Sequence, residues 1–238
     1  MKINTKKIMN TTKIKLLTFY SDSHKELYET FFLDSYNKYL KDSFELNAKH
    51  INQLSPTGDY GSAGFADTML EKINHILDNI DLSDDNVLVF ADCDIQFFTD
   101  FSDKIKEQLG EFNIKFQTDV SCVCAGFFIC RQNETVLNFF TDVKNELDKV
   151  RVNKVDDQQV INQFLNSGKY NAYKIGTLPK DEYFTVASSD HGARRWNGET
   201  FDVPKNIVAH HGNWTVGLDN KFKLMNFVKN EVTKHVNK

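Results

Sequence analysis

Long apolar runs are missing from this sequence of 238 residues. No stretch approaches the ~20 consecutive apolar residues of a membrane-spanning helix. The first residues, 1–15, are polar and rich in lysine, unlike the apolar segment of a signal peptide. We therefore expect neither a transmembrane segment nor secretion, and the expected location is cytoplasmic.

An excess of basic charge is also missing, because 29 Lys and Arg stand against 33 Asp and Glu, a formal net charge of -4. Nucleic-acid-binding proteins usually carry a basic patch, so we expect no nucleic-acid partner. Only three prolines occur, with no Pro/Gly/Ser-rich linker and no repeat. The sequence predicts a single domain over residues 1–238, with a core over about 13–223 and a C-terminal basic helix or tail.

The four cysteines suggest no disulfide framework. Cys122, Cys124 and Cys130 lie in one apolar, strand-like run, which is typical of buried core residues. A Cys-x-Cys pair can also bind zinc, but the spacing here matches no closed four-ligand site. Cysteines without such a framework indicate a reducing compartment.

Apolar strands and amphipathic helices alternate along the first half of the chain. The apolar runs at 14–20 and 87–90 predict buried strands, and 44–48 alternates like another strand. Residues 25–40 and 69–80 carry apolar side chains at helical spacing. Such alternation predicts an α/β fold with a mainly parallel sheet. In the second half we expect strands at 120–130 and 207–210 and helices at 134–147, 157–165 and 221–234.

An acidic pair, Asp92 and Asp94, directly follows the apolar run at 87–90. Ligands of open α/β sheets bind beyond the carboxyl ends of the strands, where such carboxylates can converge on Mg²⁺ or Mn²⁺. The pair alone also fits a polar turn that caps a strand. It fits a phosphatase that uses an aspartyl-phosphate nucleophile too, although Gln96 replaces the Thr or Val usual in that fold.

Three further motifs follow the acidic pair in the chain: Cys124-Ala125-Gly126-Phe127-Phe128, Asp157-Gln158-Gln159-Val160-Ile161-Asn162, and His211-Gly212-Asn213-Trp214 with Gly217 and Lys221. Together the four resemble nucleotide-diphospho-sugar transferases of the GT-A type, particularly the family of plant rhamnogalacturonan xylosyltransferases. The glycogenin and galactosyltransferase family is similar at greater distance. The resemblance implies a GT-A-like, Rossmann-type three-layer sandwich around a mainly parallel central sheet.

The resemblance also implies an activity: metal-dependent transfer of a sugar from a nucleoside-diphosphate donor, expected to be a UDP-sugar, to a carbohydrate or other hydroxyl acceptor. Retention of the anomeric configuration is expected. Asp92, Asp94 and His211 would bind the metal, Mn²⁺ or Mg²⁺. Lys221 would neutralise the leaving diphosphate and Gly217 would allow close backbone approach, although their spacing from the histidine exceeds that of the glycogenin-like pattern.

Asp157 and Gln158 match the Asp-Gln of retaining relatives, whose side chains lie beside the anomeric carbon of the donor. The resemblance implies that Asp157 orients hydroxyl groups and that Gln158 stabilises an oxocarbenium-like transition state. Otherwise Asp157 caps a helix. Gly126 falls where the backbone of these folds approaches the donor sugar.

Four residues would contact the nucleotide. Thr18 and Tyr20 match the family's base- and ribose-contacting positions, and Asp92 could be shared between metal and ribose. Lys72 lies where relatives keep a basic residue toward the nucleotide, although a lone helix lysine otherwise faces solvent.

Other residues are assigned to the rim or to the core. Asp119 would contact donor hydroxyls, and the loop at 190–196, with Arg195 and Trp196, could line the acceptor site or be plain surface. His210 is interpreted as structural. A nucleotide-sugar-binding protein without turnover is the non-enzyme alternative.

Overall fold

The computed structural model describes residues 13–236 of the chain. Its helices and strands, in chain order, are β1 (Ile14–Tyr20), α1 (Lys25–Leu27), the π-helical segment η2 (Tyr28–Leu33), α2 (Asp34–Tyr39), β2 (Phe44–His50), α3 (Phe65–Asn79), β3 (Val87–Ala91), β4 (Ile95–Phe97), α4 (Ser102–Leu109), β5 (Ile114–Asp119), β6 (Cys122–Arg131), α5 (Glu134–Val150), α6 (Asp157–Asn166), β7 (Ile175–Thr177), β8 (Tyr183–Thr185), β9 (Ala209–His211) and α7 (Leu218–Val236).

A six-stranded sheet with the order β2-β1-β3-β6-β5-β7 forms the centre of the molecule. β1 is parallel to β2 and β3, and β5 is parallel to β7, whereas β6 is antiparallel to both β3 and β5. Within this six-stranded sheet, every strand except β6 therefore runs in the same direction. The predicted α/β class with a mainly parallel sheet is confirmed.

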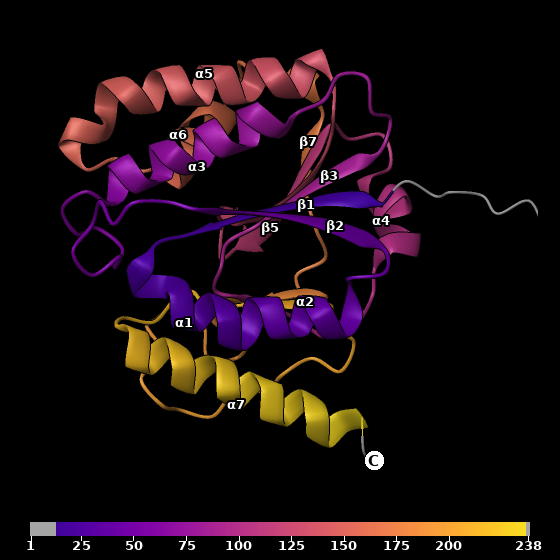
Figure 1. Ribbon diagram of the computed structural model, residues 1–238, viewed down its shortest axis with the longest axis vertical. Coiled ribbons are helices and arrows are strands. Elements are labelled where there is room, and N and C mark those ends of the chain that lie inside the picture. The colour runs from indigo at the N-terminus through magenta and orange to yellow at the C-terminus, as the bar shows by residue number, and fades with distance from the viewer. Residues whose placement is uncertain (1–12, 237–238) are drawn as a thin grey trace, which may run out of the picture.

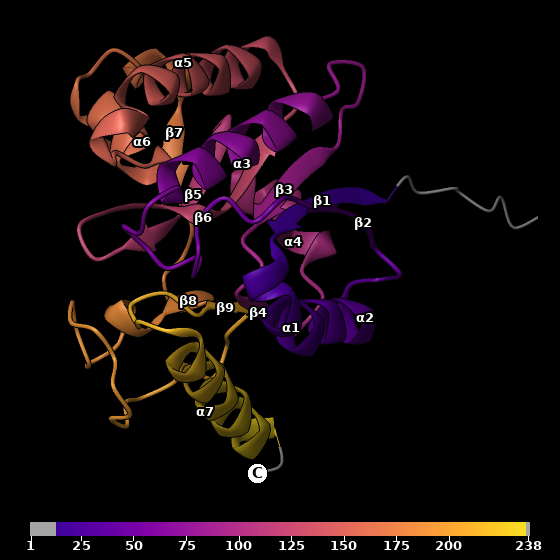
Figure 2. The same cartoon turned by 60° about the vertical axis from the view of Figure 1, so that its left-hand side comes forward.

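Helices cover both faces of this sheet (Figure 1). On one face lie α3, α5 and α6, and the apolar side chains of α3, Met69, Ile73 and Ile76, join the core there. On the other face lie α1, α2 and α7, and Figure 2 shows a smaller sheet, β4-β9-β8, between the main sheet and α7. Of its strands, only β9 (Ala209–His211) corresponds to a predicted strand, the one expected at 207–210; β4 and β8 have three residues each, too few to show a pattern.

The helix predicted over 25–40 is interrupted by the π-helical segment η2. The hydroxyl of Ser35 donates to the carbonyl of Phe31 at 2.6 Å and accepts the N–H of Phe97 in β4 at 3.0 Å. Serine bonds to a preceding carbonyl often bend helices. Here the bond also ties this segment to the smaller sheet.

The C-terminal basic segment is a helix, α7, and not a tail. Its side chains Leu224, Val228 and Val232 pack with Trp196 and Phe201 in a separate hydrophobic cluster. None of the helices within residues 13–236 combines the length and the apolar character needed to cross a bilayer.

Candidate active site

A cavity of about 430 Å³ opens at the edge of the main sheet where β1 and β3 end. Its lining includes Tyr20 at the end of β1, Asp92 after β3, Gly126 in β6, Gln158 in α6 and His211 in β9. Because β6 runs against its neighbours, its amino-terminal half reaches this edge. The cavity therefore combines segments that are distant in the sequence.

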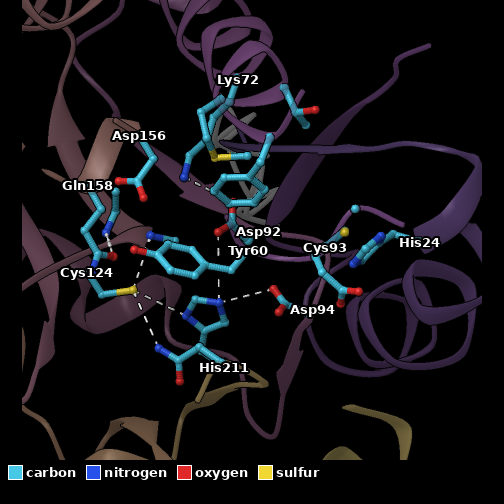
Figure 3. A pocket seen from close by; sticks show the side chains of 18 of the residues that line it. His24, Tyr60, Lys72, Asp92, Cys93, Asp94, Cys124, Asp156, Gln158 and His211 are labelled. Carbon is cyan, nitrogen blue, oxygen red and sulfur yellow. Dashed lines mark hydrogen bonds and ion pairs between the residues drawn. The ribbon is translucent and has the colours of Figure 1, made fainter. Parts of the chain in front are cut away.

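Asp92, Asp94 and His211 converge on one wall of the cavity (Figure 3). One ligand atom from each of the three side chains lies within 4.8 Å of the other two. Nε2 of His211 is 3.2 Å from Oδ1 of Asp94 and 4.0 Å from Oδ2 of Asp92. The predicted ligand triangle is thus assembled from β9 and the turn after β3.

Gly126 makes room for this cluster. A Cβ atom at position 126 would lie 2.6 Å from Oδ2 of Asp92 and would collide with the His211 ring. The glycine was predicted to admit the donor sugar. What the structure shows is that the side chains of the cluster require a glycine at this position.

Two lysines neutralise the acidic groups. Nζ of Lys72 lies 3.2 Å from Oδ1 of Asp92 and 2.9 Å from Oδ2 of Asp157. Lys221 pairs with Asp94 and donates to the carbonyl of Gly212 at 3.2 Å. Lys72 is 1% exposed, so its side chain does not face solvent, which was the alternative interpretation. Lys221, in the first turn of α7, likewise lines the cavity.

These ion pairs determine the charge state of the cluster. Burial opposes ionisation of Asp94, but Lys221 and His211 outweigh it and hold the pKa of this carboxyl well below its usual range. Burial also disfavours the His211 imidazolium, yet Asp94 outweighs it and raises the pKa of His211 well above its usual value. Asp94 is therefore the most firmly ionised carboxylate of the triangle.

Asp92 is in a different environment from Asp94. Burial raises the pKa of Asp92 to about 6, opposed by the positive charges of Lys72 and His211. For Lys72, the attraction of Asp157 and Asp92 outweighs burial and lifts the pKa of the ammonium above its usual value. The lysine thus stays charged beside the two carboxylates.

The amino terminus of α6 places Asp157 and Gln158 in the cavity. The N-cap is Asp156, whose carboxylate accepts the N–H of Gln159 at 2.8 Å, and the Gln159 side chain accepts the N–H of Asp156 at 3.0 Å. The alternative that Asp157 caps the helix is therefore wrong. Asp157 follows the cap and is free to pair with Lys72.

A chain of hydrogen bonds crosses the cavity beside Gln158. The Gln158 amide accepts the N–H of Ala125 at 3.2 Å and donates to Oδ2 of Asp119 at 3.2 Å. Oδ1 of Asp119 accepts from the indole Nε1 of Trp214 at 2.6 Å. Asp119 lines the cavity, as predicted for a rim acid, and it connects α6 with the loop before α7.

Comparison with known families accounts for this arrangement. The nucleotide-diphospho-sugar transferase family matches residues 34–225 of the chain. The chain belongs to this family. Membership of a transferase family argues against the phosphatase interpretation.

Solved structures of other glycosyltransferases share the fold. The apo form of the glycosyltransferase GlyE from Streptococcus pneumoniae TIGR4 has a TM-score of 0.56 and 15% identity over 94% of this chain, which spans 64% of the GlyE chain. The galactosyltransferase LgtC, in complex with donor and acceptor sugar analogs, has a TM-score of 0.52 and 8% identity over 93% of this chain and 96% of its own. Among curated proteins, none matches the sequence. The structural likeness confirms the predicted GT-A-like fold.

Three residues of the transferase lie away from where they were expected. Thr18 is fully buried within β1 and does not line the cavity. Gly217 is not part of the lining either; its φ of 81°, just before α7, explains the glycine without any close approach. Trp196 is 4% exposed and its Nε1 donates to the carbonyl of Glu199 at 2.6 Å, so it packs in the core. Arg195 of the same loop does line the cavity.

Several cavity residues of the transferase were missed as functional candidates. Cys124 was assigned to the core, but its Sγ lies 3.5 Å from Nδ1 of His211. His24 ends a short 3-10 helix after β1 and Tyr60 lies in the loop before α3; neither belongs to a recognisable motif, and both line the cavity. Asp156 had one available signal, since Asp followed by Gln three positions later is a capping box.

Asp156 yields a pH-dependent prediction for the transferase. Burial and the neighbouring Asp157 raise the pKa of Asp156 to about 6 from 3.8. The folded protein therefore binds this proton more tightly than the unfolded chain, so stability from this group is present below about pH 4 and lost as the pH rises through about 6.

Asp156→Asn is expected to remove this loss while keeping the N-cap, because asparagine caps as well as aspartate. At about pH 7.5 the variant should exceed the wild type by about 1–3 kcal/mol in free energy of unfolding, and the gain should vanish near pH 4. Urea unfolding at both pH values measures this. A gain of equal size at both would contradict it.

Proposed function

We propose that this glycosyltransferase transfers a sugar from a UDP-sugar to a hydroxyl acceptor, depends on a divalent cation, and retains the anomeric configuration. The observation that carries the proposal is the convergence of Asp92, Asp94 and His211 on one wall of the cavity. Carboxylate oxygens together with a neutral imidazole nitrogen suit Mn²⁺ and, less specifically, Mg²⁺. The donor set therefore fits the proposed metal.

A bound divalent cation would act as a Lewis acid that stabilises negative charge on the departing diphosphate. Lys221 lies at the same wall, so its ammonium group adds positive charge for the diphosphate. Tyr20 lines the cavity and stacks on Tyr28 with ring centroids 4.3 Å apart. This supported ring offers a flat apolar surface to a nucleobase or ribose.

The sugar would lie between the cation and the amino terminus of α6. There Asp157 is held by Lys72, and the Gln158 amide is held by Ala125 and Asp119. Such preorganised groups can orient hydroxyls and stabilise developing positive charge at low reorganisation cost. Tyr60, Arg195 and Trp214 also line the cavity and provide aromatic and cationic groups suited to an acceptor.

A thermal-shift experiment tests metal-dependent nucleotide binding. With Mn²⁺ present, UDP at about 100 times its Kd should stabilise the protein by about 2.7 kcal/mol, whereas UDP with EDTA should produce little shift. GDP with Mn²⁺ serves as the matched control for the base. Equal shifts with and without the metal would contradict metal dependence, and a larger shift with GDP would contradict the UDP-sugar donor.

Stereochemistry requires a separate experiment. A panel of UDP-sugars assayed for slow hydrolysis identifies the donor, and NMR of the transfer product then gives its anomeric configuration. We expect the product to keep the configuration of the donor. An inverted product would overturn the roles proposed for Asp157 and Gln158, while leaving the metal site intact.

A further inference from the structure

Two neighbouring histidines of β9, His210 and His211, meet two buried glutamines with opposite hydrogen-bond polarity. Successive side chains of a strand point to opposite faces, so the two rings lie in separate environments. His211 faces the cavity, whereas His210 is 0% exposed. Gln117 of β5 contacts His211, and Gln96 of β4 contacts His210.

The orientation of the Gln117 amide follows from its surroundings. Its Nε2 donates to the carbonyls of Tyr183 at 3.1 Å and of Phe184 at 3.3 Å in β8. A flipped amide would set its oxygen against these two oxygens. Oε1 therefore faces His211, 3.0 Å from Nδ1. Because an amide oxygen can only accept, Nδ1 of His211 must carry a hydrogen.

Cys124 agrees with this polarity. Its sulfur lies 3.5 Å from Nδ1 of His211 and accepts the backbone N–H of Gly126 at 3.4 Å. The sulfur thus provides a second, weaker acceptor on the same side of the ring. Nε2, on the other side, lies 3.2 Å from Oδ1 of Asp94.

Gln96 imposes the opposite arrangement on His210. Its Nε2 donates to the carbonyl of Met225 at 2.9 Å, which fixes the amide. The same nitrogen lies 3.1 Å from Nδ1 of His210, which must therefore accept and leave the ring hydrogen on Nε2. In their neutral forms, the two adjacent histidines are therefore held in opposite tautomers.

We propose that Gln117 is a positioning residue that keeps the hydrogen of His211 on Nδ1 and so reserves the Nε2 lone pair for the cation. The inference rests on the proposed metal dependence. Asp94 alone would favour a hydrogen on Nε2, where it would exclude a metal, so Gln117 acts against its neighbour. The pairing of β5 with β6 changes register between Phe116 and Gln117, and such irregularities re-aim side chains.

Histidine ring NMR on the full chain with Mg²⁺ bound tests the tautomers directly. Long-range ¹H–¹⁵N correlations should show a hydrogen on Nδ1 of His211 and on Nε2 of His210. A bound His211 that lacks the Nδ1 hydrogen would overturn the proposal. This measurement needs no variant and tests the polarity of the two rings, whereas the variants below test whether Gln117 sets it.

Two leucine substitutions provide matched variants. Gln117→Leu removes the acceptor for His211, and Gln96→Leu removes the donor for His210; each also leaves at least one buried carbonyl without its donor. We expect the Mn²⁺ affinity of Gln117→Leu, measured by calorimetry, to fall roughly 10- to 100-fold. Gln96→Leu should change it by less than about threefold, although both variants should unfold at lower temperature.

Gln117→Glu supplies a rescue variant, because a carboxyl group offers an accepting oxygen to Nδ1 in either protonation state. Its Mn²⁺ affinity should stay closer to the wild type than that of Gln117→Leu. If wild type and Gln117→Leu bind Mn²⁺ equally well, or if Gln96→Leu loses as much affinity, this inference alone is overturned. A wild type that binds no divalent cation overturns the proposed function and this inference together.

Discussion

Replacing Asp94 with asparagine is expected to abolish metal-dependent nucleotide binding and to reduce sugar transfer by about 10³-fold. A divalent cation supplies several kcal/mol of transition-state charge stabilisation, and each 1.36 kcal/mol is a factor of ten in rate. We expect Asp94 to contribute most to the proposed site, because Lys221 and His211 outweigh burial and keep its pKa well below the usual range, so that this carboxylate stays ionised. Asparagine preserves the shape and removes the charge.

The experiment compares Asp94→Asn with Asp34→Asn. Asp34 also pairs with a lysine, Lys229, at 3.2 Å, but this pair is about half exposed and lies outside the cavity lining. Calorimetric titration with Mn²⁺ and UDP, followed by transfer rates, should separate the two variants. If Asp94→Asn binds Mn²⁺ with UDP as tightly as Asp34→Asn does, the metal site is misplaced.

Replacing Lys72 with methionine is expected to cost about 3–5 kcal/mol in free energy of unfolding at about pH 7.5. Methionine fills most of the space of the lysine, so packing changes little. The loss of stability arises because the carboxylates of Asp92 and Asp157 would be buried without the ammonium group that now lies between them. Protonation relieves such charge, so the loss should shrink as the pH falls toward 5, and Mn²⁺ should restore part of it through Asp92.

Lys49→Met is the matched control. Lys49 also pairs with a carboxylate, Glu71, at 3.3 Å. In this pair, however, the side chains are 34% and 40% exposed. Exposed pairs contribute about 0–1 kcal/mol. Urea unfolding of both variants at the two pH values measures the difference. A Lys72→Met variant that loses no more than Lys49→Met would show that the buried carboxylates are neutralised in another way.

Much of the central sheet could be predicted because its signals are local. The apolar runs that became β1 and β3 and the amphipathic face of α3 each lie within one short window. The direction of β6 could not be predicted, since a strand buried on both faces looks the same whether it runs parallel or antiparallel. That direction brings Cys124 and Gly126 to the cavity.

The candidate site was predictable only in part. Asp92 and Asp94 follow a recognisable strand, but only the resemblance connected them with His211. The burial of Lys72 does have a local signal, because this lysine stands three residues after Met69 and four before Ile76, on the apolar face of α3. Gln117 carried no signal at all, because its role depends on the pairing of β5 with segments far along the chain.

The order of these segments along the chain also determines when the site can form. Asp94 and its partner Lys221 are separated by 127 residues, and His211 likewise follows long after the acidic turn. Chains are synthesised from the amino terminus, and completed units fold first. A nascent chain that ends before β9 therefore contains the acidic turn without its histidine and its balancing lysine, so the proposed cation site can form only after β9 and the start of α7 have been synthesised.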